Sequence, residues 1–280
     1  QCGADHHESA WYVEGGNNSR LHEETATSNG LGIVWDVSER LSLSADYWEI
    51  DLKGKSQYLD TATLMSENAS CLLGRRVDGT PVDPNSGACA VYLAYVQRDA
   101  AGKVTEYFLD AISQAGVRTR GVDASLKYAW SGGALGDFSL NAGYSRTLGY
   151  DVQVAAGDPW QDYMGCSYSA TYSCGNQPLA YRSRGNWTLG WNRGDWSASL
   201  YGYRNGARVN YQASAQLPSY VQWNASLSKK ITGNMRLGVD VTNLFDRYGP
   251  KDASMTWYPF YQNIYGIQGR AVYVNLDIDF

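Results

Sequence analysis

The sequence has 280 residues, a formal net charge of −5 at pH 7 and a mean hydropathy of −0.42. The acidic balance and the absence of a Lys/Arg cluster argue against nucleic-acid binding. Because no 18 apolar residues run together, the sequence contains no transmembrane helix. Residues Gln1 to Glu8 lack the positive-then-apolar pattern of a signal peptide, so we expect the chain to begin inside a longer protein.

Alternation at period two dominates from about Ser28 onward, which predicts β-strands. Nine strands are expected, centred near residues 32, 46, 122, 143, 186, 202, 225, 240 and 272. The last segment is the clearest, because its apolar side chains share one face: Val272, Val274, Leu276, Ile278 and Phe280. One face suits lipid and the other suits water, as in a membrane β-barrel. In the strand from Arg40 to Asp51, Glu49 follows the apolar positions, so that strand either shifts phase or leaves the membrane there.

The connections between these strands are of two alternating kinds. Short turns are predicted at residues 36–39, 131–137, 192–195 and 232–234, and longer polar links at about 56–113, 152–178, 212–218 and 248–264. Outer-membrane barrels have short turns on one rim and long loops on the other. Tryptophans flank the short turns and predict an aromatic girdle there: Trp35, Trp130, Trp191 and Trp196. The alternatives are the edges of a soluble β-sandwich or lectin, against which the apolar face of the last strand argues.

Amphipathic aromatics and cysteines add two further indications. Tyr (22) and Trp (10) far outnumber Phe (5), as expected where an apolar layer meets water. Four of the five cysteines form two close pairs in polar, Gly-rich stretches, which predicts disulfides rather than zinc sites: Cys71 with Cys89, and Cys166 with Cys174. Disulfides indicate an oxidising compartment or the cell surface. Cys2 is left over, and its simplest partner is a cysteine upstream of Gln1.

Residues 239–248, Val-Asp-Val-Thr-Asn-Leu-Phe-Asp-Arg-Tyr, resemble the penultimate-strand signature of TonB-dependent receptors. Gly269-Arg270 and a strand ending in Phe280 follow at a similar spacing, and Phe280 resembles the family's outer-membrane assembly signal. The Gly121-Val122-Asp123 step and the strands around residues 30–32 and 41–48 also resemble that family.

This resemblance implies an all-β fold: a transmembrane antiparallel β-barrel in the bacterial outer membrane. Residues 1–280 would be about the last nine strands of a roughly 22-stranded barrel, without the plug domain and the earlier strands. A complete bacterial barrel has an even number of strands. Nine strands cannot close a wide barrel alone, so their open edges would need the missing strands as partners. The intact receptor would import a scarce ligand, namely siderophore-iron, a vitamin or a saccharide. Its partners would be the TonB complex through the missing N-terminal part, the barrel assembly machinery, outer-membrane lipid and surface lipoproteins.

Candidate ligand-binding residues fall in two aromatic loops and a set of arginines. One loop contains Trp160, Gln161, Asp162, Tyr163, Tyr168 and Tyr172, and the other contains Met255, Trp257, Tyr258, Phe260 and Tyr261. Their aromatic rings suit a ligand ring or sugar, but a disulfide-pinned lid and an extracellular belt are equal alternatives. Four arginines predicted to face the lumen would attract an anionic ligand, unless neighbouring acids neutralise them: Arg182, Arg184, Arg204 and Arg208.

Other chemistry is disfavoured by the sequence. His6 and His7 beside Cys2 lack a third metal ligand at suitable spacing. Residues 78–85 lack the calcium-loop pattern and fit ordinary turn chemistry. We expect no cofactor and no enzymatic activity, since three histidines and no nucleophile motif leave little room for a general base. A surface or adhesive barrel without transport is the alternative function.

Overall fold

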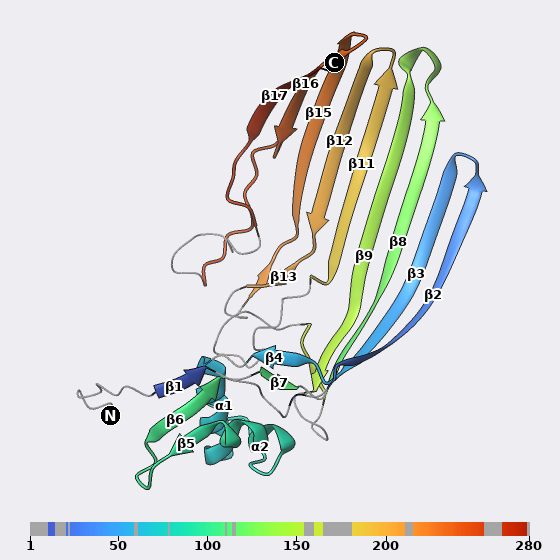
Figure 1. The fold of residues 1–280 in the computed structure, drawn as a ribbon. Helices are drawn as coiled ribbons and strands as arrows, with labels where there is room; N and C mark the ends of the chain where they lie inside the picture. Colours follow the sequence, from blue (N-terminus) through green and yellow to red (C-terminus); the bar gives the residue numbers. More distant parts are fainter. Residues whose placement is uncertain are drawn as a thin grey trace.

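The computed structural model describes residues 11–14, 21, 23–58, 61–77, 79–109, 111–113, 116–153, 160–164, 181–210, 215–254 and 265–278. It consists of one long, curved antiparallel sheet and a small helical unit at the end of the sheet that carries the longer connections (Figure 1). No described helix is long and apolar enough to cross a membrane.

Nine long strands form the sheet, and each pairs with its neighbour in chain order. They are β2 (Thr25–Ser38), β3 (Leu41–Lys53), β8 (Gly116–Ser131), β9 (Asp137–Gln153), β11 (Ser183–Arg193), β12 (Trp196–Asn205), β15 (Tyr220–Thr232), β16 (Met235–Thr242) and β17 (Ala271–Ile278). The short β10 (Gln161–Asp162) pairs with the far end of β9. Every predicted strand centre lies within one of the nine strands, so the sequence-based strand prediction is confirmed.

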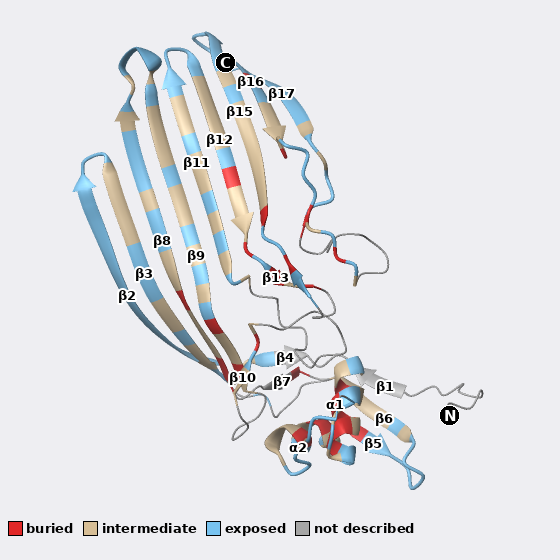
Figure 2. Cartoon of the chain, turned by 180° about the vertical axis from the view of Figure 1, so that it is seen from behind, coloured by how far each residue is buried: buried red, intermediate tan, exposed pale blue. Residues whose placement is uncertain are grey.

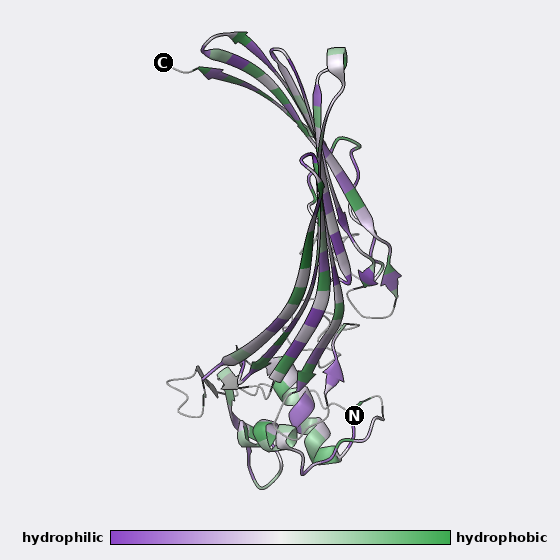
Figure 3. Ribbon diagram, turned by 90° about the vertical axis from the view of Figure 1, so that its right-hand side faces the viewer, coloured by the Kyte–Doolittle hydropathy of each residue, from purple (hydrophilic) through white to green (hydrophobic). Residues whose placement is uncertain are grey.

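The register gives the sheet one apolar and one polar face. Paired positions carry matching side chains across the strands, such as Leu189 opposite Leu200 and Val239 opposite Val274. On the opposite face, the Ser199 and Ser226 hydroxyls lie 2.7 Å apart. Figure 3 shows this alternation as bands of opposite hydropathy along each strand. Within the described residues, β2 and β17 each have one paired neighbour in this sheet, and Val274 stays 71% exposed.

The charged end of β3 has a simple explanation. Its pairing with β8 runs without a register shift from Leu41 to Lys53, so the strand does not change phase. From Glu49 on, the face that was apolar instead carries charged residues, and Asp51 accepts from Arg118 at 3.2 Å. The phase shift, one of the two alternatives that the sequence leaves open, is therefore wrong. That the strand leaves the membrane at Glu49 stays a prediction.

The four short turns lie at one end of the sheet (Figure 1). Each of the four tryptophans of the predicted girdle lies on the apolar face near its turn. Trp130 stacks on Phe138 with ring centroids 5.1 Å apart, and the Lys229 ammonium lies 4.9 Å from the Trp196 ring centroid. The Trp191 indole N–H donates to the Leu135 carbonyl at 2.7 Å, in the 3-10 turn η1 (Gly133–Leu135).

The link predicted as a polar loop at 56–113 is instead a folded unit, which corrects the expectation from sequence. It contains α1 (Thr61–Leu73), α2 (Gly87–Ala94), β5 (Val96–Arg98) and β6 (Val104–Leu109), with β1 (Trp11–Glu14) parallel to β6. β4 (Ser56–Tyr58) and β7 (Ala111–Ser113) pair at its base. Its buried core is formed by Leu64, Cys71, Cys89, Tyr92, Tyr95 and Val96. Figure 2 shows most buried residues in this unit and at the adjoining end of the sheet.

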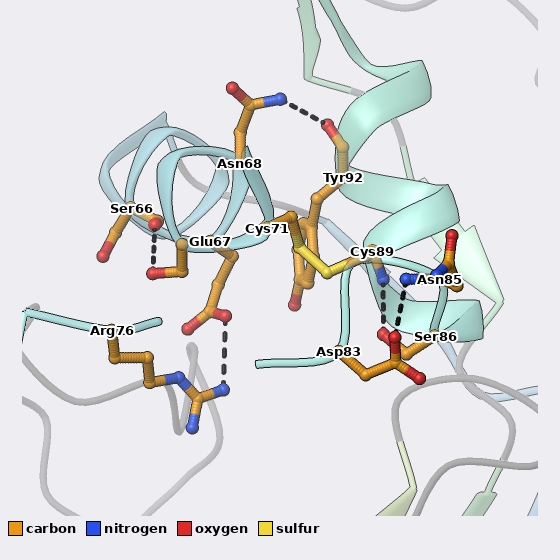
Figure 4. The surroundings of a disulfide bond; sticks show 11 residues. Ser66, Glu67, Asn68, Cys71, Arg76, Asp83, Asn85, Ser86, Cys89 and Tyr92 are labelled. Atoms are coloured by element: carbon orange, nitrogen blue, oxygen red, sulfur yellow. Dashed lines mark hydrogen bonds and ion pairs between the residues drawn. A yellow bond between two sulfur atoms is a disulfide. The ribbon is translucent and has the colours of Figure 1, made fainter. Parts of the chain in front are cut away.

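The predicted Cys71–Cys89 disulfide is confirmed, and it joins α1 to α2 (Figure 4). Beside it, Asn68 donates to the Tyr92 carbonyl at 3.1 Å and accepts from Arg98 at 2.7 Å. Glu67 is 6% exposed and pairs with Arg76 at 3.2 Å. The helical period was hidden in the sequence because α1 buries polar residues as well as apolar ones. Cys2, Cys166 and Cys174 lie outside the described residues.

We expect the double substitution of Cys71 and Cys89 by serine to loosen the helical unit alone. A crosslink that closes a loop of this size stabilises by about 3 kcal/mol through the unfolded state. Hydrogen exchange of the α1 and α2 amides should accelerate, whereas the amides of β11 and β12 should be unchanged. Equal acceleration in both regions would mean that the unit and the sheet unfold together.

Candidate functional site

A tight turn after β16 fixes the loop end of the sheet. Asn243 and Asp246 have φ values of 51° and 52°, in the left-handed region that Asn and Asp tolerate better than other side chains. Asn243 is 2% exposed and donates to the carbonyls of Arg247 at 2.9 Å and Gln268 at 3.3 Å. Its own Oδ1 accepts from the Arg247 N–H at 2.9 Å. The Asn-Leu-Phe-Asp motif is therefore a structural anchor.

The same turn holds the chain that returns to β17. Asp246 accepts from the Arg270 N–H at 2.8 Å, and a Cβ at Gly269 would lie 2.8 Å from that Asp246 oxygen. The Tyr220 hydroxyl donates to the Arg247 carbonyl at 2.9 Å. These contacts explain the spacing between the Asn-Leu-Phe-Asp segment and Gly269-Arg270. Tyr265 precedes Gly269-Arg270 in the same loop and packs against Tyr220.

A group of tyrosines and arginines gathers next to this anchor, at the loop end of β11, β12 and β15. We call it the Tyr181 cluster, which comprises Tyr181, Arg184, Tyr203, Arg208, Tyr220 and Tyr265. Two guanidinium groups lie over the Tyr181 ring, with Arg184 Cζ 4.7 Å and Arg208 Cζ 5.1 Å from its centroid. Arg208 begins β13 (Arg208–Val209), which pairs with β14 (Gln216–Leu217). The cluster combines cationic and aromatic groups from separate segments of the chain.

The tyrosines at the base of the cluster are packed against one another. Tyr220 is 6% and Tyr265 2% exposed, and their ring centroids lie 5.4 Å apart in an edge-to-face arrangement. The Tyr203 hydroxyl donates to Gln222 Oε1 at 2.9 Å, and the Tyr203 and Tyr220 ring centroids lie 6.4 Å apart. Burial raises the pKa of Tyr265 well above its usual value, so its phenol stays protonated at physiological pH. These rings form the buried base of the Tyr181 cluster, and its exposed side chain is Arg184.

The four predicted lumen-facing arginines do not share one face. Arg184 pairs with Asn205 and Ser145 on the polar face. Arg204 pairs with Gly185 and Val221 and is in phase with Leu200, so it lies on the apolar face. The expectation that Arg204 faces the lumen is therefore wrong, because a residue's face follows from its phase in the strand and not from its charge. Arg182 precedes β11, and its carbonyl accepts from the Thr147 N–H at 3.1 Å.

Two residues of the first aromatic loop have packing contacts. The Trp160 ring centroid lies 4.0 Å from the Arg118 guanidinium carbon. Tyr163 is 7% exposed and packs with Val117 and Val152, and its N–H donates to the Tyr150 carbonyl at 2.8 Å. Asp162 is exposed and accepts from the Met164 N–H at 2.8 Å. Ligand contact by these three residues stays a prediction.

Several other predicted residues lie outside the described residues: Tyr168, Tyr172, Met255, Trp257, Tyr258, Phe260, Tyr261, Phe280, His6 and His7. In the segment considered for calcium, the Asp83 carboxylate accepts from the Asn85 N–H at 2.9 Å, which is ordinary turn chemistry. Sequence reasoning missed Tyr181, Tyr203, Tyr220 and Tyr265. Tyr203 and Tyr220 were visible as aromatics on the polar phase of their strands, but nothing in the sequence placed Tyr181 and Tyr265 beside them.

The architecture is that of an outer-membrane β-barrel wall: an apolar outer face with aromatics near the short turns, and elaborate connections at the other end. The family model for the TonB dependent receptor-like β-barrel matches residues 6–244, so the chain belongs to this family, whose barrels are outer-membrane proteins. No curated protein sequence matches the chain.

Solved structures show the same fold at low sequence identity. The ferric-catecholate import receptor Fiu of E. coli K12 has a TM-score of 0.53 and 14% identity over 96% of this chain and 30% of its own. The ferric enterobactin receptor PfeA of Pseudomonas aeruginosa has a TM-score of 0.55 and 17% identity over 92% of this chain and 31% of its own. The copper transporter OprC has a TM-score of 0.53 and 12% identity, over 94% and 33% respectively. The chain thus spans about a third of these proteins.

Replacing Asn243 by Ala should destabilise the anchor by about 2–4 kcal/mol, since three side-chain hydrogen bonds are lost and Ala is strained at positive φ. Asn243→Gly is the matched control, because it loses the same hydrogen bonds but keeps the conformation without strain. Hydrogen exchange of the Arg270 amide, whose acceptor Asp246 is kept in both variants, measures both effects. Equal effects of the two variants would exclude a contribution from backbone strain.

A pH dependence follows from Tyr163. Burial, followed by the nearby Glu67 carboxylate, raises the pKa of Tyr163 to about 12. The folded protein holds this proton more tightly than the unfolded chain. The resulting contribution to folding stability, about 2–3 kcal/mol, is therefore complete below pH ~10 and is lost as the pH rises to ~12. Tyrosinate absorbance measured against Tyr163→Phe should show this late ionisation. Ionisation of Tyr163 near its usual pKa would contradict the buried placement.

Proposed function

We propose that this chain is the C-terminal part of the barrel of a receptor that imports a scarce ligand across the outer membrane, energised through the TonB complex. The family match and the fold support this proposal. So do β2 and β17, each of which has one paired neighbour among the described strands, because strand edges need backbone partners in an apolar layer. The plug and the TonB contact would belong to the part of the receptor that lies outside residues 1–280.

We further propose that the ligand is an anionic metal chelate rather than a neutral saccharide or a vitamin. The observation that carries this choice is Arg184, which is exposed on the polar face and lies, together with the buried Arg208, over the Tyr181 ring. Guanidinium groups bind carboxylate and phenolate oxygens through charge-assisted hydrogen bonds. Stacking on a sugar would need an exposed ring, but Tyr220 and Tyr265 are buried against each other.

Charge balance within the site points the same way. Among the described residues, no carboxylate lies within ion-pair distance of Arg184, whereas Arg118 and Arg120 have Asp51 and Asp151. The exposed guanidinium of Arg184 can therefore engage an incoming anion without first breaking an ion pair. Ferric-catecholate and ferric enterobactin receptors are among the proteins with this fold, which is compatible with a ferric chelate.

The test uses the full receptor and three probes: a ferric tris-catecholate, a neutral oligosaccharide and cobalamin. We expect the chelate to bind tightest and Arg184→Gln to weaken it about tenfold or more, because a hydrogen bond to a charged group is lost. Tyr181→Ala should act in the same direction by removing the support of both guanidinium groups. The matched control is Arg236→Gln on the polar face near the short turns, which should leave binding unchanged.

Equilibrium binding and uptake by cells that lack other receptors provide the two measurements. Tight saccharide or cobalamin binding that Arg184→Gln does not alter would overturn the chelate assignment and leave the import role intact. Binding without uptake in the presence of an active TonB complex would instead support a surface receptor that does not transport.

A further inference from the structure

Two arginines lie on the apolar face, on strands that flank β11. Arg146 of β9 pairs with Val122 and Ser183, and Arg204 of β12 pairs with Gly185 and Val221. Arg204 Nη1 donates to the Ser183 hydroxyl at 3.0 Å. Because β9 and β12 are two strand spacings apart, or ~10 Å, the Arg146 side chain is also long enough to reach the surface around Ser183. The register thus directs two guanidinium groups and a hydroxyl toward one place.

No acid shares the two register rows that carry these arginines. The rows, followed through the described strands, contain Leu31, Tyr47, Val122, Arg146 and Ser183, and then Ile33, Ala45, Ala124, Tyr144, Gly185, Arg204 and Val221. One row further from the short turns, Arg120 is already paired with Asp151 at 3.5 Å. Arg146 and Arg204 therefore lie at the border of the apolar band, where a charge on the lipid face costs least.

A groove on the same face adjoins Arg204. It has a volume of about 640 Å³, and Arg204 borders it. The small side chains of Ala45, Ala124 and Ala142 form its floor between the larger Trp35 and Trp187. The Trp187 ring is held in place because it lies across Gly202 and packs edge-on against Trp223, with ring centroids 5.0 Å apart. The groove is apolar, so on a barrel wall it suits a hydrocarbon chain.

We propose that Arg146, Ser183 and Arg204 bind the phosphate of an anionic lipid of the surrounding membrane, with one acyl chain of that lipid in the groove. Guanidinium groups match phosphate geometry, and the surrounding apolar layer strengthens each charge-assisted hydrogen bond. The head group would lie at the membrane border and the chain would run toward the short turns. The proposal depends on the outer-membrane placement of the family and is independent of the imported ligand.

The test is native mass spectrometry of the full receptor in detergent, titrated with lipid A and with lipid A from which the phosphates have been removed. We expect lipid A to bind wild type and the double variant Arg146→Gln/Arg204→Gln to bind it at least about tenfold more weakly. The dephosphorylated lipid should bind wild type as weakly as lipid A binds the double variant. Arg236→Gln, the same change on the polar face, should bind lipid A like wild type.

The groove is tested separately by Ala124→Leu, which fills the floor and leaves both arginines in place. This variant should also lose lipid A, and circular dichroism of all variants confirms that the β-structure is kept. Unchanged binding by the double variant, or equal binding of both lipids to wild type, would overturn the phosphate site. Complete displacement of lipid A by inorganic phosphate would show an anion site that holds no acyl chain.

Discussion

The need to pair every backbone N–H and C=O group inside an apolar layer governs this structure. Neither water nor lipid can replace a missing backbone partner there, so the chain crosses as paired strands. β8 and β9 accordingly pair over almost their full lengths. Once the backbone is paired, side chains alternate freely between an apolar and a polar face, and a slip of one residue would exchange the two faces. The register therefore decides which side chains meet lipid and which face the lumen.

The end of the sheet with the longer connections is released from this constraint, and its structure differs accordingly. Glu67 and Asn68 are buried in α1, which an apolar layer would not tolerate. They can be buried here because Arg76 pairs with Glu67 and Arg98 donates a hydrogen bond to Asn68. The unit is too small for a large core, and a disulfide compensates for limited burial in such small units. The elements near the candidate site thus depend on polar contacts and a covalent link rather than on apolar burial.

Sequence reasoning located the strands because their period of two is repeated many times along the chain. The prediction was wrong for Arg204, where this period was not used to assign the face, and for the helices, which have no period of two. Arg204 is in phase with Leu200 and Ala198, so its apolar face was evident from the sequence, and grouping it with Arg184 by charge was the error. The helices gave no clear period because α1 buries polar residues. Tyr181 and Tyr265 meet only through tertiary structure, which no local pattern encodes.

The two faces are linked through β11 and β12. Arg184 and Gly185 are consecutive, so Arg184 can face the lumen only while Gly185 and its partner Arg204 face outward. Contacts on the lipid side that hold this register therefore also position the lumen site. A Cβ at Gly202 would collide with the Trp187 ring, which lies across that glycine and so favours the observed pairing of the two strands. Packing of Trp187 on the apolar face thereby helps to position Arg184 on the polar face, although the two side chains point to opposite sides of the sheet.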